Sequence, residues 1–160
     1  MAIKTDLEKA YDKLEWSFIR DTLHRANIPV RLIDIIMSCV TSVSTSILFN
    51  GGCLEEFRPS RGIRQGDPLF SYLFILCIDY LRHLIAEKCE ANCWTPVKAS
   101  RGGPAFSHLF FVDDIVLFAK ADLINCSTIR DVLDQFCDQL FYSPNVDRDT
   151  RESFSDILAI

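Results

Sequence analysis

The chain has 160 residues, a formal net charge of −5 and a hydrophobic content of 49 %. This length favours one domain with a core of its own, and this composition excludes a disordered chain. The acidic charge is unusual for a free-standing nucleic-acid binder, which normally presents a basic surface. Acidic clusters do suit a site that holds divalent cations.

The chain has seven cysteines, of which Cys89 and Cys93 are the closest two. They form no C-x-x-C pair and no second pair follows, which argues against a zinc site. We expect reduced cysteines in the core of an intracellular protein, either nuclear or cytoplasmic, with no membrane partner. The longest mostly apolar run, 69–81, is shorter than the roughly 20 residues that span a bilayer, and predicts a helix buried on most sides.

In the first half of the chain, the predicted elements are a strand over 2–6, helices over 16–25 and 30–41, and hairpin strands over 43–49 and 53–57. Asn50 and Gly51 separate the two hairpin strands and are typical of a type I′ turn. Helical spacing places several apolar residues on inward faces. For the first helix these are Trp16, Ile19 and Leu23, and for the second Leu32, Ile35, Ile36 and Cys39.

In the second half, the predicted elements are a long helix over 67–89, a tight hairpin with strands over 109–112 and 115–119, and a helix over 123–140. Asp67 suits the N-cap of the long helix and Pro68 its first position. The last helix has an apolar stripe made by Ile129, Val132, Leu133 and Phe136. This order predicts an α+β fold with helices packed on one face of a small antiparallel sheet.

Three carboxylates occupy the ends of predicted strands. Asp6 ends the first strand, while Asp113 and Asp114 occupy a hairpin tip between apolar flanks, where both cannot be buried without a partner. Antiparallel pairing would bring Asp6 beside Asp113, and clustered carboxylates bind Mg²⁺ through oxygen. Two such ions support phosphoryl transfer. The alternative is a simple turn, because Asp tolerates positive φ.

Residues 4–12, 61–69 and 111–114 form three sequence boxes. They resemble the K-x-D-x-x-K-A-[FY]-D, R-G-[LI]-R-Q-G-D-P-L and F-A-D-D motifs of reverse transcriptases from plant-type non-LTR (LINE-like) retrotransposons. The boxes follow the order of that family, and the resemblance covers about residues 2–140. It implies a polymerase palm, incomplete because the fingers and thumb are missing.

The resemblance implies RNA-directed DNA synthesis from an RNA template, a DNA primer and deoxynucleotides. Asp6 and Asp113 would hold two Mg²⁺ ions, with Mn²⁺ as the alternative metal, and Asp114 would support them. Tyr11 would lie under the sugar of the incoming nucleotide and clash with a 2′-hydroxyl. Ordinary aromatic packing is the alternative for Tyr11.

The second box would line the nucleotide pocket. Gly66 would let the backbone approach the ligand, and Gln65 offers both a donor and an acceptor. Arg64 would contact phosphate with its forked donors, with a plain surface arginine as the alternative. The family pattern continues L-S-P-Y-L-F, so we expect the bulky Phe70 to disturb this pocket. Val112, where the family has Ala, suits a strand.

The end of the chain departs from the family. No lysine follows Lys120, which predicts that residues 1–140 are a palm fragment and 141–160 a remnant after an internal deletion of a palm strand. Two alternatives stay open: a catalytically inactive retrotransposon remnant, and a non-catalytic protein-binding module with a large exposed apolar patch. An unrelated Mg²⁺-dependent phosphatase or nuclease is less well supported. The sequence does not indicate an oligomeric state.

Overall fold

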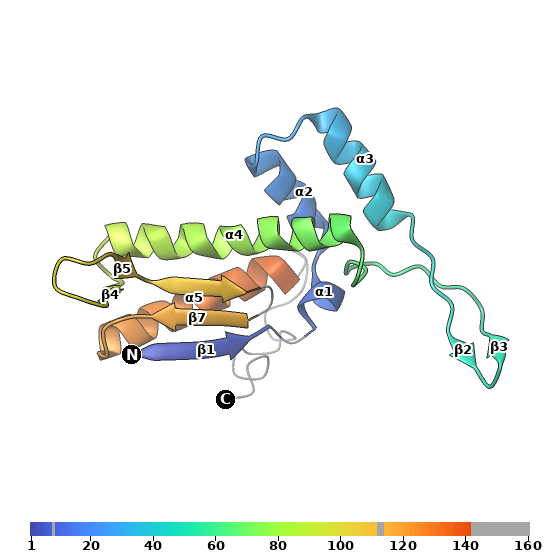
Figure 1. The fold of residues 1–160 in the computed structure, drawn as a ribbon. Helices are drawn as coiled ribbons and strands as arrows, with labels where there is room; N and C mark the ends of the chain where they lie inside the picture. Colours follow the sequence, from blue (N-terminus) through green and yellow to red (C-terminus); the bar gives the residue numbers. More distant parts are fainter. Residues whose placement is uncertain (8, 112–113, 142–160) are drawn as a thin grey trace.

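The computed structural model describes residues 1–7, 9–111 and 114–141. Its elements in chain order are β1 (Ala2–Asp6), α1 (Ala10–Lys13), α2 (Trp16–Arg25), α3 (Val30–Thr41), β2 (Leu48–Phe49), β3 (Gly52–Cys53), α4 (Pro68–Glu90), β4 (Val97–Lys98), β5 (Ala105–Phe106), β6 (His108–Phe111), β7 (Asp114–Phe118) and α5 (Leu123–Phe141). The main sheet is antiparallel with strand order β1-β7-β6, and the long helices α4 and α5 run alongside it (Figure 1). The predicted α+β class is confirmed.

Local sequence signals explain several boundaries. The Asp67 carboxylate accepts a hydrogen bond of 2.9 Å from the Leu69 backbone N–H, and Pro68 occupies the first turn of α4. Asn50 and Gly51 have φ of 47° and 80°, which is the positive-φ pair that a type I′ turn requires. The caps and turn predicted from sequence are therefore confirmed.

The sheet has a covered face and an open face, because successive strand residues point to opposite sides. Thr5, Ile115 and Leu117 are at most 4 % exposed and belong to the covered face. The two β7 residues join one continuous core with the buried residues of α4 and α5. The alternate residues of each strand, among them Asp6 on β1 and Asp114 on β7, face the open side.

The helices supply most of the core. The predicted stripe of α5 is confirmed, since all four of its residues are buried: Ile129, Val132, Leu133 and Phe136. Trp94 is 1 % exposed and its indole N–H donates a 3.0 Å hydrogen bond to the Phe118 carbonyl. This bond anchors the end of β7 to the loop after α4.

The predicted inward face of α3 is largely wrong, because of its four residues only Ile36 packs against the core. Ile33, Met37 and Val40 are buried there, whereas Leu32 and Ile35 are 45 % and 62 % exposed. The helix carries apolar side chains all around, so periodicity alone could not select the face. The neighbouring helix α2 packs against α3, and this packing determines which face of α3 is buried.

Two further expectations need correction, and one stays untested. The sequence missed the single-turn helix α1 and the small β4–β5 hairpin, because each is too short to show a period. The cysteines are mostly not in the core: only Cys77 and Cys137 are buried, and burial raises the pKa of each of these thiols to about 12. Of the remnant expected at 141–160, the structure describes only Phe141, so the deletion stays a prediction.

The surface of α4 is more open than its sequence predicted. Tyr72 and Ile75 are 69 % and 56 % exposed, so the helix is not buried on most sides. Among the described residues α4 alone is long and apolar enough to cross a membrane. The core helix of a folded domain meets the same criterion, and eight α4 residues are buried.

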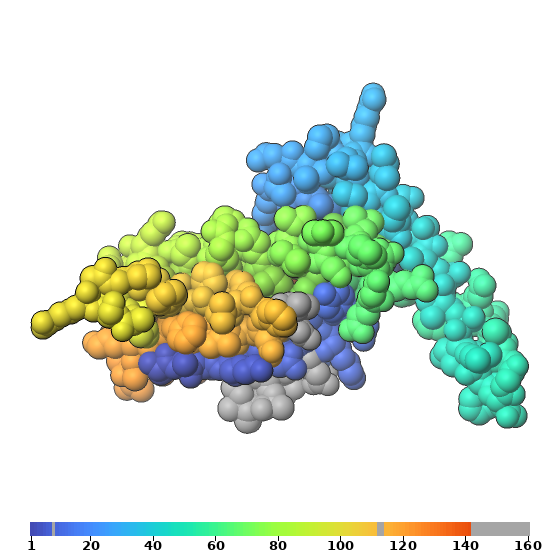
Figure 2. Space-filling model, viewed as in Figure 1, coloured from blue at the N-terminus to red at the C-terminus, as the bar shows by residue number. Residues whose placement is uncertain are grey.

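Residues 43–59 form an arm that extends away from the body of the molecule (Figures 1 and 2). The β2–β3 hairpin lies at its tip, and the Thr45 and Phe57 backbones pair nearer the body. Several large apolar side chains of the arm are exposed: Ile47, Leu48, Phe49, Leu54 and Phe57.

Gly62 lies where two segments approach closely, and this generates a stability prediction. Its φ is +85°, and a Cβ atom added there would lie 2.6 Å from the Asp12 carbonyl oxygen. Gly66 has a φ of +87° with open space around it, so it is the matched control. We expect Gly62→Ala to lower the free energy of unfolding by roughly 2–4 kcal/mol and Gly66→Ala by about 1–2 kcal/mol. Chemical denaturation measures both, and equal losses would contradict the close approach.

The half-buried Tyr11 ring generates a second prediction. It stacks on Phe74 with ring centroids 4.3 Å apart. We expect Tyr11→Ala to cost roughly 2–3 kcal/mol of unfolding free energy, and Tyr11→Phe to cost almost nothing because the stacked ring remains. Thermal and urea unfolding of both variants give the comparison. A large loss in Tyr11→Phe would instead assign the stability to the hydroxyl.

Candidate active site

The centre of the candidate site is one cross-strand pair. β1 and β7 are antiparallel, and their register places Asp6 directly opposite Asp114. Directly opposite residues have Cβ atoms about 4.5–5.5 Å apart and point to the same face of the sheet. Asp114 also lies opposite Phe111 of β6. The sheet therefore brings together two of the three predicted carboxylates on its open face, while Asp113 lies outside the described residues.

Lys4 adds a cation beside the Asp6–Asp114 pair, and the sequence motifs assign it no role. It lies two residues before Asp6 on β1 and so faces the same side. Its ammonium nitrogen is 2.9 Å from the Asp114 Oδ1 atom, and its side chain is 65 % exposed. The spacing of two along a strand was the signal that could have identified Lys4.

Backbone hydrogen bonds attach the second sequence box to the first. The Gly62 N–H donates to the Leu14 carbonyl at 2.8 Å, and the Ile63 N–H donates to the Tyr11 carbonyl at 2.7 Å. The Trp16 indole N–H donates to the Gly62 carbonyl at 2.7 Å. These bonds hold residues 61–63 beside the segment that follows β1. Trp16 is thus a positioning residue for this box as well as a packing residue.

The predicted nucleotide-binding residues differ in their surroundings. The Tyr11 ring is half-buried against Phe74 with an interplanar angle of 19°, so packing holds its position. Gln65 and Gly66 are exposed in the turn before α4, and a Cβ added at Gly66 would meet nothing within 4 Å. The backbone around Gly66 is consequently open to a ligand.

A cavity of about 680 Å³ lies beside this box, at the base of the arm. Its lining includes Arg61, Arg64, Asp12, Phe70 and the hydroxyl-bearing segment 44–46. Phe70 is 4 % exposed and forms part of the wall, and its expected disturbance of the nucleotide pocket stays a prediction. The cavity offers guanidinium donors and hydroxyl groups beside an apolar wall, a combination that suits phosphate and base together.

The ion pairs around the site are modest. Arg61 lies 4.0 Å from Glu15. Burial raises the pKa of the Glu15 carboxyl, and the Arg61 guanidinium opposes that rise. Because Arg61 is half exposed, most of its charge stays available at the mouth of the cavity.

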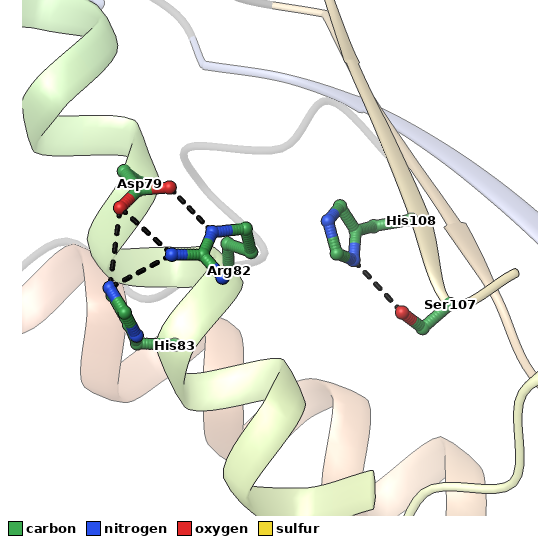
Figure 3. A network of polar contacts seen from close by, with 5 residues as sticks. All are labelled: Asp79, Arg82, His83, Ser107 and His108. Carbon is green, nitrogen blue, oxygen red and sulfur yellow. Dashed lines mark hydrogen bonds and ion pairs between the residues drawn. The ribbon is translucent and has the colours of Figure 1, made fainter.

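A second polar network lies on the covered side of the sheet and is separate from the aspartates (Figure 3). Asp79 accepts hydrogen bonds from Arg82 and lies 3.2 Å from His83. The Arg82 hydrogen bond lowers the pKa of Asp79, while burial lowers the pKa of His108 on the facing strand. His108 and Phe110 point to the covered face of the sheet, opposite to the face of Phe111. This network therefore points away from the carboxylate pair.

The donor set fits a hard divalent cation. Two carboxylates from adjacent strands converge on the open face, and hard cations such as Mg²⁺ take oxygen ligands. Within the described ranges, no group of three or more His, Cys, Asp or Glu side chains is arranged to hold a metal. The described part therefore brings two carboxylates together on this face, those of Asp6 and Asp114.

Comparison with known proteins places this geometry in a family. Residues 1–147 match the family described as reverse transcriptase (RNA-dependent DNA polymerase). Enzymes of this family generally use divalent metal ions, in agreement with the paired carboxylates.

Two curated relatives extend the match. The chain is 34 % identical over 115 residues to a retrovirus-related Pol polyprotein from the type-2 retrotransposable element R2DM of Drosophila melanogaster, an alignment that covers 72 % of this chain and 10 % of that protein. It is 42 % identical over 67 residues to an uncharacterized mitochondrial protein of Arabidopsis thaliana, covering 42 % of this chain and 55 % of that protein. The chain thus spans about a tenth of the fly protein and about half of the plant one.

A solved structure supports the fold. The telomerase of Candida albicans, determined in complex with a fragment of telomeric RNA, superimposes with a TM-score of 0.61 and 16 % identity over 94 % of this chain and 27 % of that one. At this identity the likeness establishes the fold, and the palm-like arrangement predicted from sequence is confirmed. Together with the family match over most of the chain, this identifies the protein as a member of the reverse transcriptase (RNA-dependent DNA polymerase) family.

Proposed function

We propose that this chain forms the nucleotidyl-transfer centre of an RNA-directed DNA polymerase related to those of non-LTR retrotransposons. One observation carries the proposal: the register of β1 and β7 places Asp6 opposite Asp114 on the open face of the sheet. Like charges directly opposite one another destabilise a sheet, and a cation bound between them offsets that cost. Asp113, the other acid of the same hairpin, is the proposed third member.

The proposed roles follow from the chemistry of each side chain. Asp6 and Asp113 hold two Mg²⁺ ions and Asp114 supports them. Bound there, the ions would activate a primer 3′-hydroxyl and stabilise the leaving oxygen of the pyrophosphate. The exposed turn at Gln65 and Gly66 binds the incoming deoxynucleotide through backbone and amide groups. Tyr11, fixed by Phe74, excludes a 2′-hydroxyl at the sugar.

The proposed partners are an RNA template and a DNA primer. The open face has exposed apolar side chains, since Leu109 and Phe111 are 62 % and 73 % exposed, and base planes stack on such surfaces. Arg61 and Arg64 line the cavity at the arm and provide guanidinium donors for phosphate. They place positive charge beside the site in a chain whose net charge is −5.

Primer extension tests the proposal. The purified 160-residue chain is given an RNA template, a DNA primer, deoxynucleotides and Mg²⁺, beside Asp6→Asn, Asp113→Asn and Asp131→Asn variants. We expect incorporation by the wild type and a loss of about a hundredfold or more in Asp6→Asn and Asp113→Asn, since each removes a metal ligand. Asp131 is exposed on α5, and its variant should keep full activity.

The outcomes separate the alternatives. No incorporation by the wild type would contradict the proposal for this chain and favour the inactive-remnant alternative. Incorporation that survives in Asp6→Asn would show that the paired carboxylates are not the catalytic centre. Circular dichroism of each variant confirms that the fold is retained.

A further inference from the structure

The carboxylate pair carries a local electrostatic cost. Asp6 and Asp114 lie directly opposite one another, and like charges in such cross-strand positions destabilise a sheet. Asp6 is exposed, and the Asp114 side chain is 41 % exposed. A positive charge near this pair offsets that cost.

Lys4 supplies that charge. Its Cα lies opposite Val116, one position diagonal from Asp114 on the same face, and its Nζ atom is 2.9 Å from Asp114 Oδ1. Of the described strand residues that share this open face, Lys4 is the one cation. The others are Ala2, Asp6, Leu109, Phe111, Asp114, Val116 and Phe118.

We propose that Lys4 is the resident counter-ion of the carboxylate pair in the metal-free protein, and that it must release Asp114 when a divalent cation binds. The inference rests on the proposed function, because it takes Asp6 to be a metal ligand and Asp114 to support the bound ion. Lys4 is then a positioning residue. It neutralises Asp114 before the ion arrives, and its positive charge opposes the binding of an ion beside Asp114.

The geometry suits a reversible competitor. A lysine ammonium is a compact point charge on a flexible stem, so it can leave a carboxylate without moving the strand. The two side chains are 65 % and 41 % exposed, and exposed ion pairs are weak enough to be exchanged. A buried pair would instead block the site.

A metal titration tests the competition. Mn²⁺ binding to the full 160-residue chain is followed by electron paramagnetic resonance for wild type, Lys4→Gln, Lys4→Arg and Lys120→Gln. We expect Lys4→Gln to bind Mn²⁺ about two- to fivefold more tightly, the range that loss of one exposed ion pair allows. Lys4→Arg keeps the charge and should bind Mn²⁺ no more tightly than the wild type.

Lys120→Gln is the matched control for net charge. Lys120 is 69 % exposed and lies 3.5 Å from Asp122, so it also makes an exposed ion pair, but beyond the end of β7. We expect its variant to retain the wild-type affinity for Mn²⁺. Unchanged or weaker binding in Lys4→Gln would overturn the proposal, as would equal tightening in Lys120→Gln.

A second readout needs no metal and keeps the inference separable from the proposed function. In the chelator-treated protein, Lys4→Gln should lower the melting temperature of the wild type but not that of an Asp114→Asn background, since the pair is already broken there. If the wild type binds no Mn²⁺, the metal part of the proposed function fails. This double-mutant cycle then decides the counter-ion role: coupling supports it, and absence of coupling overturns it.

Discussion

The pairing of β1 with β7 is the constraint on which the candidate site depends. These strands are far apart in sequence, and five consecutive residue pairs join them from Ala2–Phe118 to Asp6–Asp114. Shifting this register by one residue would turn every side chain of β1 to the other face. Thr5 would then face solvent and Asp6 would enter the core, so the packing of the covered face also fixes the acids on the open face.

The same logic extends to the second sequence box. Residues 61–63 have no strand or helix of their own, and hydrogen bonds to the backbone near α1 hold them in place. Only a glycine at position 62 permits this approach, because a Cβ would collide with the Asp12 carbonyl. The box that precedes α4 is therefore held in a fixed position relative to β1, the strand that carries Asp6. The proposed catalytic acids and the proposed nucleotide pocket therefore share one structural frame.

The charged and apolar side chains exposed around the candidate site are consistent with its proposed function. The open face combines Asp6, Asp114 and Lys4 with exposed apolar residues of β6, and the arm and α4 expose further apolar side chains. Monomeric domains rarely leave such surfaces uncovered, and exposed apolar patches commonly mark sites where other molecules bind.

The sequence by itself determined the elements with strong local signals: the bounds of α2 and α3, the capped start of α4, the Asn50–Gly51 turn and the family motifs. Local signals sufficed there because caps, positive φ and helical period act within a few residues. Tertiary structure decided the buried face of α3, the short α1, the exposure of most cysteines and the partner of Asp6. The tertiary structure also places Lys4 beside Asp114 and Trp16 beside Gly62. Those features depend on which surfaces meet across the fold, and strand register and helix packing set them through contacts that no local pattern encodes.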